Sequence, residues 1–135
     1  MINRELINPQ SIVVVGGSNN VHKPGGRLVR NLLDGKYKGE LYVVNAKEDD
    51  VQGLKSYHSV HDIPETELAI ISIPGPACPE AVDVLAKQKN VKAFIVISAG
   101  FGEETHEGAI LEEQMLKSIN EAGASLIGPC LLYTS

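Results

Sequence analysis

The chain has few of the residues that would narrow its class at once. Its 135 residues include no tryptophan, two phenylalanines and two cysteines, and 4% are aromatic. A core with so few large rings must be built mainly from Val, Ile, Leu and Ala. The two cysteines, Cys78 and Cys130, form neither a CxxC pair nor the spacing of a zinc site, so we expect reduced thiols and no disulfide framework.

Clustered positive charge and long apolar runs are also missing. The formal net charge is −5 and the lysines and arginines are dispersed, which argues against a DNA or RNA partner. No segment reaches the roughly 18 apolar residues of a membrane span, and the opening MINRELINPQ lacks the apolar core of a signal peptide. We therefore expect a cytoplasmic protein with neither nucleic acid nor membrane as a partner.

What the chain does have is an alternation of apolar runs and helical periods, on a length that fits one domain. Short β-branched runs near Gly, Pro, Asn or Asp predict five buried strands. They are Ser11–Val15, Glu40–Asn45, Leu68–Ile73, Ala93–Ser98 and Ala124–Ile127. The interval from Ala46 to Thr66 is less regular.

Segments of helical period lie between these strands. They predict helices over Gly26–Leu33, Pro79–Lys89 and Glu104–Ala122. Pro79 suits a first helical turn, and Gly123 suits a left-handed helix end. The apolar positions of the third helix are Ile110, Leu111, Met115, Leu116 and Ile119. Strands that alternate with helices predict an α/β, Rossmann-like doubly wound sheet, mainly parallel and five-stranded, with helices on both faces.

Ligands of such sheets bind beyond the carboxyl ends of the strands. The loop after Val15 reads GGSNNVHKPGGR, and glycines between a strand and a helix start are typical of phosphate binding by backbone N–H groups. The candidate residues in this loop are Gly16, Gly17, Ser18, Asn19, Gly25 and Gly26. A purely structural turn is the alternative.

The spacing of the loop excludes two common nucleotide motifs. A GxGxxG fingerprint from Gly16 would need glycines where Ser18 and Val21 stand, and a Walker loop from Gly17 would need one where His22 stands. An NAD site also wants a carboxylate after the second strand, where this chain has Asn45-Ala46-Lys47. Lys47 favours a phosphorylated ribose. The acidic residues that follow it keep NAD open.

Five stretches carry a family resemblance. They read GGSNNVHKPGGRLVRNLL, YKGELYVVNAKEDDVQGLKSYHSVHDIP, IISIPGPACPEAV, FIVISAGFGEE and SLIGP. In this order they resemble the coenzyme A (CoA) binding domain of nucleoside-diphosphate-forming acyl-CoA synthetases, a superfamily that includes succinyl-CoA synthetase alpha subunits. The resemblance covers nearly the entire chain.

The resemblance implies where CoA would bind. Its phosphates would contact Gly16, Ser18, Asn19, Lys23, Gly25 and Gly26, and Lys47 would contact the nucleotide part. The corners after the third and fourth strands would flank pantetheine and adenine through Ile73, Pro74, Ile97, Ser98 and Ala99. One departure stands at the end, where the family has Gly-Pro-Asn-Cys and this chain has Gly128-Pro129-Cys130-Leu131.

The resemblance also implies a division of labour. Residues 1–135 would be the CoA-binding domain at the N-terminal end of a longer acid–thiol ligase of the ADP-forming type. The phosphorylated histidine and the ATP-grasp portion of that enzyme are not in this chain, so we assign no catalytic residue and no metal ligand. Expected partners are CoA or acyl-CoA and the remaining ligase domains or a beta-type subunit. A stand-alone CoA-binding or ligand-sensing module, or an NAD(P)-binding domain, are the alternatives.

Overall fold

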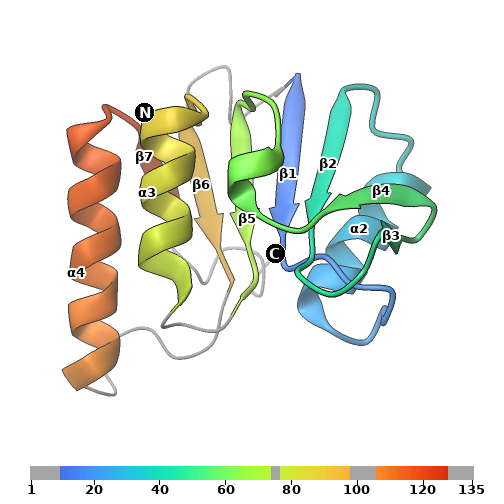
Figure 1. Ribbon diagram of the computed structural model, residues 1–135, viewed down its shortest axis with the longest axis horizontal. Coiled ribbons are helices and arrows are strands. Elements are labelled where there is room, and N and C mark those ends of the chain that lie inside the picture. The colour runs from blue at the N-terminus through green and yellow to red at the C-terminus, as the bar shows by residue number, and fades with distance from the viewer. Residues whose placement is uncertain (1–9, 74–76, 98–105, 128–135) are drawn as a thin grey trace.

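The computed structural model describes residues 10–73, 77–97 and 106–127, which form one sheet with helices on both of its faces (Figure 1). The strands are β1 (Ser11–Val15), β2 (Glu40–Val44), β3 (Asp50–Val51), β4 (Leu54–Tyr57), β5 (Leu68–Ile71), β6 (Ala93–Val96) and β7 (Ser125–Ile127). The helices are α2 (Pro24–Asp34), α3 (Cys78–Gln88) and α4 (His106–Glu121), with a short 3-10 turn η1 (Val60–Asp62).

The strand order is β3-β4-β2-β1-β5-β6-β7. All neighbours are parallel except β3 and β4, which are antiparallel. When the parallel strands alone are numbered along the chain, their order becomes 3-2-1-4-5-6, which is that of the doubly wound Rossmann fold. The predicted fold class is confirmed, and the direction of strand order reverses between β1 and β5.

The sheet has seven strands where five were predicted, because the interval after Lys47 contains a small hairpin. Its strands β3 and β4 are joined by Gln52 and Gly53, whose φ angles are +50° and +89°. Positive φ at both central positions is the geometry of a type I′ hairpin turn. The usual sequence signal for that turn is Asn-Gly or Asp-Gly, and Gln-Gly does not carry it.

Burial on both faces explains the unbroken β-branched run of β1. Ile12 and Val14 belong to the core cluster that includes Val29 of α2. Val13 and Val15 belong to the cluster that α3 and α4 cover, and Figure 1 shows these two helices together in front of the sheet and α2 behind it. A strand covered on both faces needs apolar side chains in both directions.

The apolar stripe expected on α4 is only partly buried. Met115 and Ile119 are 2% and 1% exposed, whereas Ile110 and Leu116 are 41% and 36% exposed. The side chain of Leu111 lies outside the described residues. The buried pair faces α3. The helix ends at Glu121, and Gly123 just after it has the left-handed conformation that was predicted for the helix end, with a φ of +72°. Among the described residues, no helix is long and apolar enough to cross a membrane.

Charged groups also link α3 to α4. Lys87 Nζ lies 2.8 Å from Asp83 Oδ1 and 3.0 Å from Glu121 Oε1, and Ser118 donates a hydrogen bond of 2.9 Å to Asp83. The hydrogen bond from Lys87, followed by that from Ser118, lowers the pKa of Asp83. The contribution of Asp83 to stability is therefore present above the pKa of the unfolded chain and is lost as pH falls through the lowered value.

The two kinds of apolar position on α4 predict different costs of truncation. Ile119→Ala should lower the free energy of unfolding by about 2–5 kcal/mol, because it opens a cavity beside α3. The matched change Leu116→Ala on the same helix should cost less than about 1 kcal/mol, since that side chain is already partly in water. Urea titration followed by circular dichroism measures both, and equal losses would contradict this packing of α4.

Candidate functional site

The carboxyl ends of four neighbouring strands are level. Register pairs the last residues of β2, β1, β5 and β6, which are Val44, Val15, Ile71 and Val96. Backbone hydrogen bonds continue one residue further, from Gly16 N to Val44 O at 2.8 Å and from Ser72 N to Val15 O at 2.7 Å. The described corners that the sequence selected therefore lie along one edge, at the point where the strand order reverses.

The start of α2 has backbone N–H groups that the helix itself does not use. Pro24 occupies the first turn, and Lys23 before it gives no side-chain cap. The first helical hydrogen bond of the i to i−4 type runs from Arg27 N to Lys23 O, at 2.9 Å. The N–H groups of Gly25 and Gly26 come before it and therefore have no partner of this type within the helix. The first turn holds no acidic residue. Such a helix start can bind an anion through its N–H groups and its dipole.

Two glycines allow the loop to fold against this helix start. Gly16 has a φ of +94°, a backbone conformation that residues with a side chain rarely adopt. A Cβ atom at Gly25 would overlap the carbonyl oxygen of Gly16. The backbone that leaves β1 is thus in direct contact with the backbone that enters α2, as expected of a phosphate-binding turn.

The polar side chains of the loop mostly bind its own backbone. Ser18 Oγ accepts a hydrogen bond of 3.0 Å from Asn20 N, and Asn20 Oδ1 accepts one of 2.9 Å from His22 N. Ser18 keeps its hydroxyl hydrogen as a donor for a ligand. Asn19 differs from the sequence expectation, because its Nδ2 donates to Asp50 O at 2.9 Å and its Oδ1 accepts from Gln52 N at 2.7 Å. Asn19 thus joins the loop to the hairpin.

Asn45 connects the loop to the corner of Lys47. Its Nδ2 donates to Gly17 O at 2.9 Å, and its Oδ1 accepts from Lys47 N at 2.8 Å and Glu48 N at 3.1 Å. In the sequence this residue counted only as a neutral amide in place of a carboxylate. The tendency of asparagine to bind the backbone two or three residues on, in an Asx turn, could have predicted its bonds to Lys47 N and Glu48 N, but not its bond to Gly17 O.

Lys47 is exposed, and none of the ion pairs between described residues includes it. Of the acidic neighbours that kept NAD open, Asp49 has an ion-pair partner, since its Oδ1 lies 2.8 Å from His58 Nε2. An exposed cation at the corner after β2 is suited to an anionic group of a ligand.

The third and fourth corners are described only in part. Ile73 is half-buried. A Cβ atom added to Gly16 would lie 2.9 Å from Ile73 Cγ2, so this side chain packs against the Gly16 backbone. Ile97 is 6% exposed and packs in the cluster of α2, so its side chain belongs to the core. The candidates Pro74, Ser98 and Ala99 lie outside the described residues, as does the Gly128-Pro129 end.

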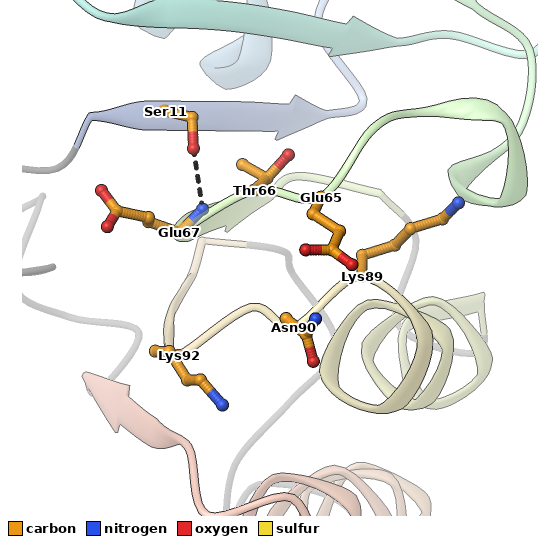
Figure 2. Close-up of a pocket in the computed structure, with 7 residues that line it drawn as sticks. All are labelled: Ser11, Glu65, Thr66, Glu67, Lys89, Asn90 and Lys92. Atoms are coloured by element: carbon orange, nitrogen blue, oxygen red, sulfur yellow. Dashed lines mark hydrogen bonds between the residues drawn. The ribbon is translucent and has the colours of Figure 1, made fainter.

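A separate hollow of about 250 Å³ lies at the opposite edge of the sheet (Figure 2). Its lining residues are Ser11, Glu65, Thr66, Glu67, Lys89, Asn90 and Lys92. They surround the amino ends of β1, β5 and β6, and the bond from Glu67 N to Ser11 Oγ, at 2.9 Å, closes that edge. Its mixture of two carboxylates and two ammonium groups gives an anion no net attraction, so it is not the phosphate site.

Taken together, the sheet order, the uncapped helix start and the exposed lysine at the next corner are the features of a Rossmann-like domain with a candidate site for a ligand of nucleotide type. The chain belongs to the CoA binding domain family, whose model matches residues 10–134.

Relatives of known activity agree with this assignment. The chain is 39% identical over 127 residues to ADP-forming acetate–CoA ligase II of Archaeoglobus fulgidus, which covers 93% of this chain and 19% of that protein. It is 38% identical over 126 residues to the alpha subunit of ADP-forming acetate–CoA ligase II of Pyrococcus furiosus, with coverage of 92% and 27%. The chain thus spans about a fifth to a quarter of the length of these relatives.

A solved structure gives the same result. Acetyl-coenzyme A synthetase 1 of Ca. Korarchaeum cryptofilum, in its apo form, matches with a TM-score of 0.82 at 34% identity, over 93% of this chain and 27% of that one. The recognised family and the CoA-binding region of acyl-CoA synthetases are therefore confirmed.

The hydrogen bonds of Asn45 predict a local loss of stability on its truncation. Asn45→Ala removes one bond to the loop and two to the corner of Lys47, and should lower the free energy of unfolding by about 1–3 kcal/mol. The control Asn120→Ala, at an exposed position of α4, should change it by less than about 0.5 kcal/mol. Thermal and urea unfolding measure both variants, and an Asn45→Ala chain as stable as the control would contradict this role.

Proposed function

We propose that the chain binds CoA along the carboxyl edge of its sheet, with the phosphates between the Gly16–Gly26 loop and Lys47. The observation that carries the proposal is membership of a CoA-binding family over residues 10–134. The geometry of the loop supports it, because an uncapped helix start and two exposed cations suit phosphate groups.

Each part of the loop would have a distinct task in this proposal. The N–H groups of Gly25 and Gly26 and the hydroxyl of Ser18 would donate hydrogen bonds, while Lys23 and Lys47 would supply charge. The remaining described candidates, Gly16, Gly17, Asn19, Ile73 and Ile97, would act through backbone shape or packing. Asn19 in particular would hold the loop, since both polar atoms of its side chain already have partners.

In a longer protein this domain would present CoA to catalytic domains. We propose an ADP-forming acid–CoA ligase, which interconverts acyl-CoA, nucleoside diphosphate and phosphate with the free acid, CoA and nucleoside triphosphate. Other domains or a beta-type subunit would supply the chemistry. Binding the nucleotide part far from the thiol lets the enzyme use that binding energy to orient the reacting end.

The test compares ligands that differ in one group each. Calorimetry of the 135-residue chain should show binding of CoA, weaker binding of dephospho-CoA, and weaker binding still of NADH. Lys47→Ala should weaken CoA binding about tenfold, because it removes a charge-assisted contact, and should change dephospho-CoA binding less than about twofold. Lys117→Ala, an exposed lysine of α4, is the control for net charge and should leave both unchanged.

Three outcomes would overturn parts of this proposal. A chain that binds NADH as tightly as CoA, or binds no CoA, would contradict CoA as the ligand. Dephospho-CoA lacks the 3′-phosphate of CoA. An equal effect of Lys47→Ala on the binding of both would show that Lys47 does not contact this phosphate, and would not contradict CoA as the ligand.

A further inference from the structure

The turn of the β3–β4 hairpin contacts both ends of the Gly16–Gly26 loop. Gln52 Nε2 donates to Ser18 O at 2.8 Å and to Gly26 O at 2.9 Å. Ser18 lies just after β1, and Gly26 lies in the first turn of α2. One side-chain amide therefore ties the beginning of the loop to its end, and Figure 1 shows the hairpin beside α2 at this edge of the sheet.

The backbone of the hairpin reinforces this contact. Gln52 N donates to Asn19 Oδ1, and Asn19 Nδ2 donates back to Asp50 O, at 2.7 and 2.9 Å. The hairpin begins three residues after Lys47, whose own N–H is held by Asn45. The loop and the lysine corner are thus joined to the same small unit.

The conformation of Gln52 has an energetic cost that its contacts must offset. Its φ of +50° is unusual for a residue with a side chain, and such conformations persist where the surroundings over-determine them. The side chain is also fixed in orientation, because only its NH₂ group can face two carbonyl oxygens. Its Oε1 is buried and has no hydrogen-bond partner in the described part of the chain. The hairpin turn itself requires the positive φ, but it does not require the two side-chain hydrogen bonds to Ser18 and Gly26.

We infer that Gln52 is a positioning residue for the phosphate loop: its amide holds Ser18 and Gly26 so that the loop donors are ordered before CoA arrives. The inference rests on the proposed CoA binding. Ordering a loop in advance lowers the entropy lost on binding. Removing the amide should therefore weaken CoA binding although Gln52 itself donates nothing to the ligand.

Two substitutions isolate the amide. Gln52→Met keeps the length and the positive φ but cannot donate, and should weaken CoA binding about tenfold in calorimetry on chains shown to be folded by circular dichroism. The matched control is Lys36→Met, which makes the same kind of change in an exposed turn with a φ of +56°. Lys36 stands before β2, at the opposite edge, and its variant should bind CoA within about twofold of the wild type.

Gln52→Glu supplies a pH signature that simple loss of packing would not give. Its carboxylate would face two carbonyl oxygens, which raises its pKa, and the protonated form could donate to one of them. CoA affinity relative to wild type at the same pH should be lowest near about pH 8 and should recover as pH falls toward about 5.5. Gln52→Met should show no such recovery.

Amide hydrogen exchange without ligand provides a separate readout. In Gln52→Met the N–H groups of Asn20, His22 and Lys23 should exchange at least about tenfold faster, while the core strands keep wild-type rates. Unchanged CoA affinity and loop exchange, or faster exchange throughout the sheet, would overturn the positioning role and leave CoA binding intact. A wild-type chain that binds no CoA would overturn the proposed function, and loop exchange would still decide whether Gln52 orders the loop.

Discussion

The register of β1 against its two neighbours is the constraint on which the site depends. The β-branched run Ile12–Val15 is apolar toward both faces, so the alternation that usually fixes register is absent here. The residue after the run supplies the missing constraint. A Cβ atom at Gly16 would overlap the carbonyl oxygen of Ser72. A shift of β1 by one residue that placed Val15 beside Ser72 is therefore excluded, because Val15 has a Cβ. The glycine at the start of the Gly16–Gly26 loop therefore limits the shift of β1 in that direction.

The main elements could be predicted because local signals and packing agree. Pro24 and Pro79 stand in first helical turns, Gly123 closes α4, and alternating strands and helices define the parallel order. The hairpin could not be predicted in the same way. Its turn lacks the common dipeptide, and its stabilising bonds join Gln52 to residues 34 and 26 positions away. Contacts of that sequence separation exist only once the sheet has formed.

The candidate site shows the same division. The glycines and the helix start follow from residue type alone, since only backbone N–H groups and small residues suit that place. The partners of Asn19 and Asn45 do not, because an amide near a loop can bind a ligand or the protein equally well. On α4 the apolar period identified the buried Met115 and Ile119 but also the partly exposed Ile110 and Leu116. Periodicity shows which side of a helix is apolar, but it does not show how much of that side is covered by the rest of the protein.

The polar side chains around the loop have a common use that bears on recognition. Asn19, Asn45 and Gln52 each direct their amide groups at backbone atoms, so neutral side chains build the shape of the loop. In the proposed site, backbone N–H groups and the exposed charges of Lys23 and Lys47 would remain for the ligand. Shape and charge are then set by different residues. A change in an amide would alter how well the loop is ordered, whereas a change in a lysine would alter which anionic groups it prefers.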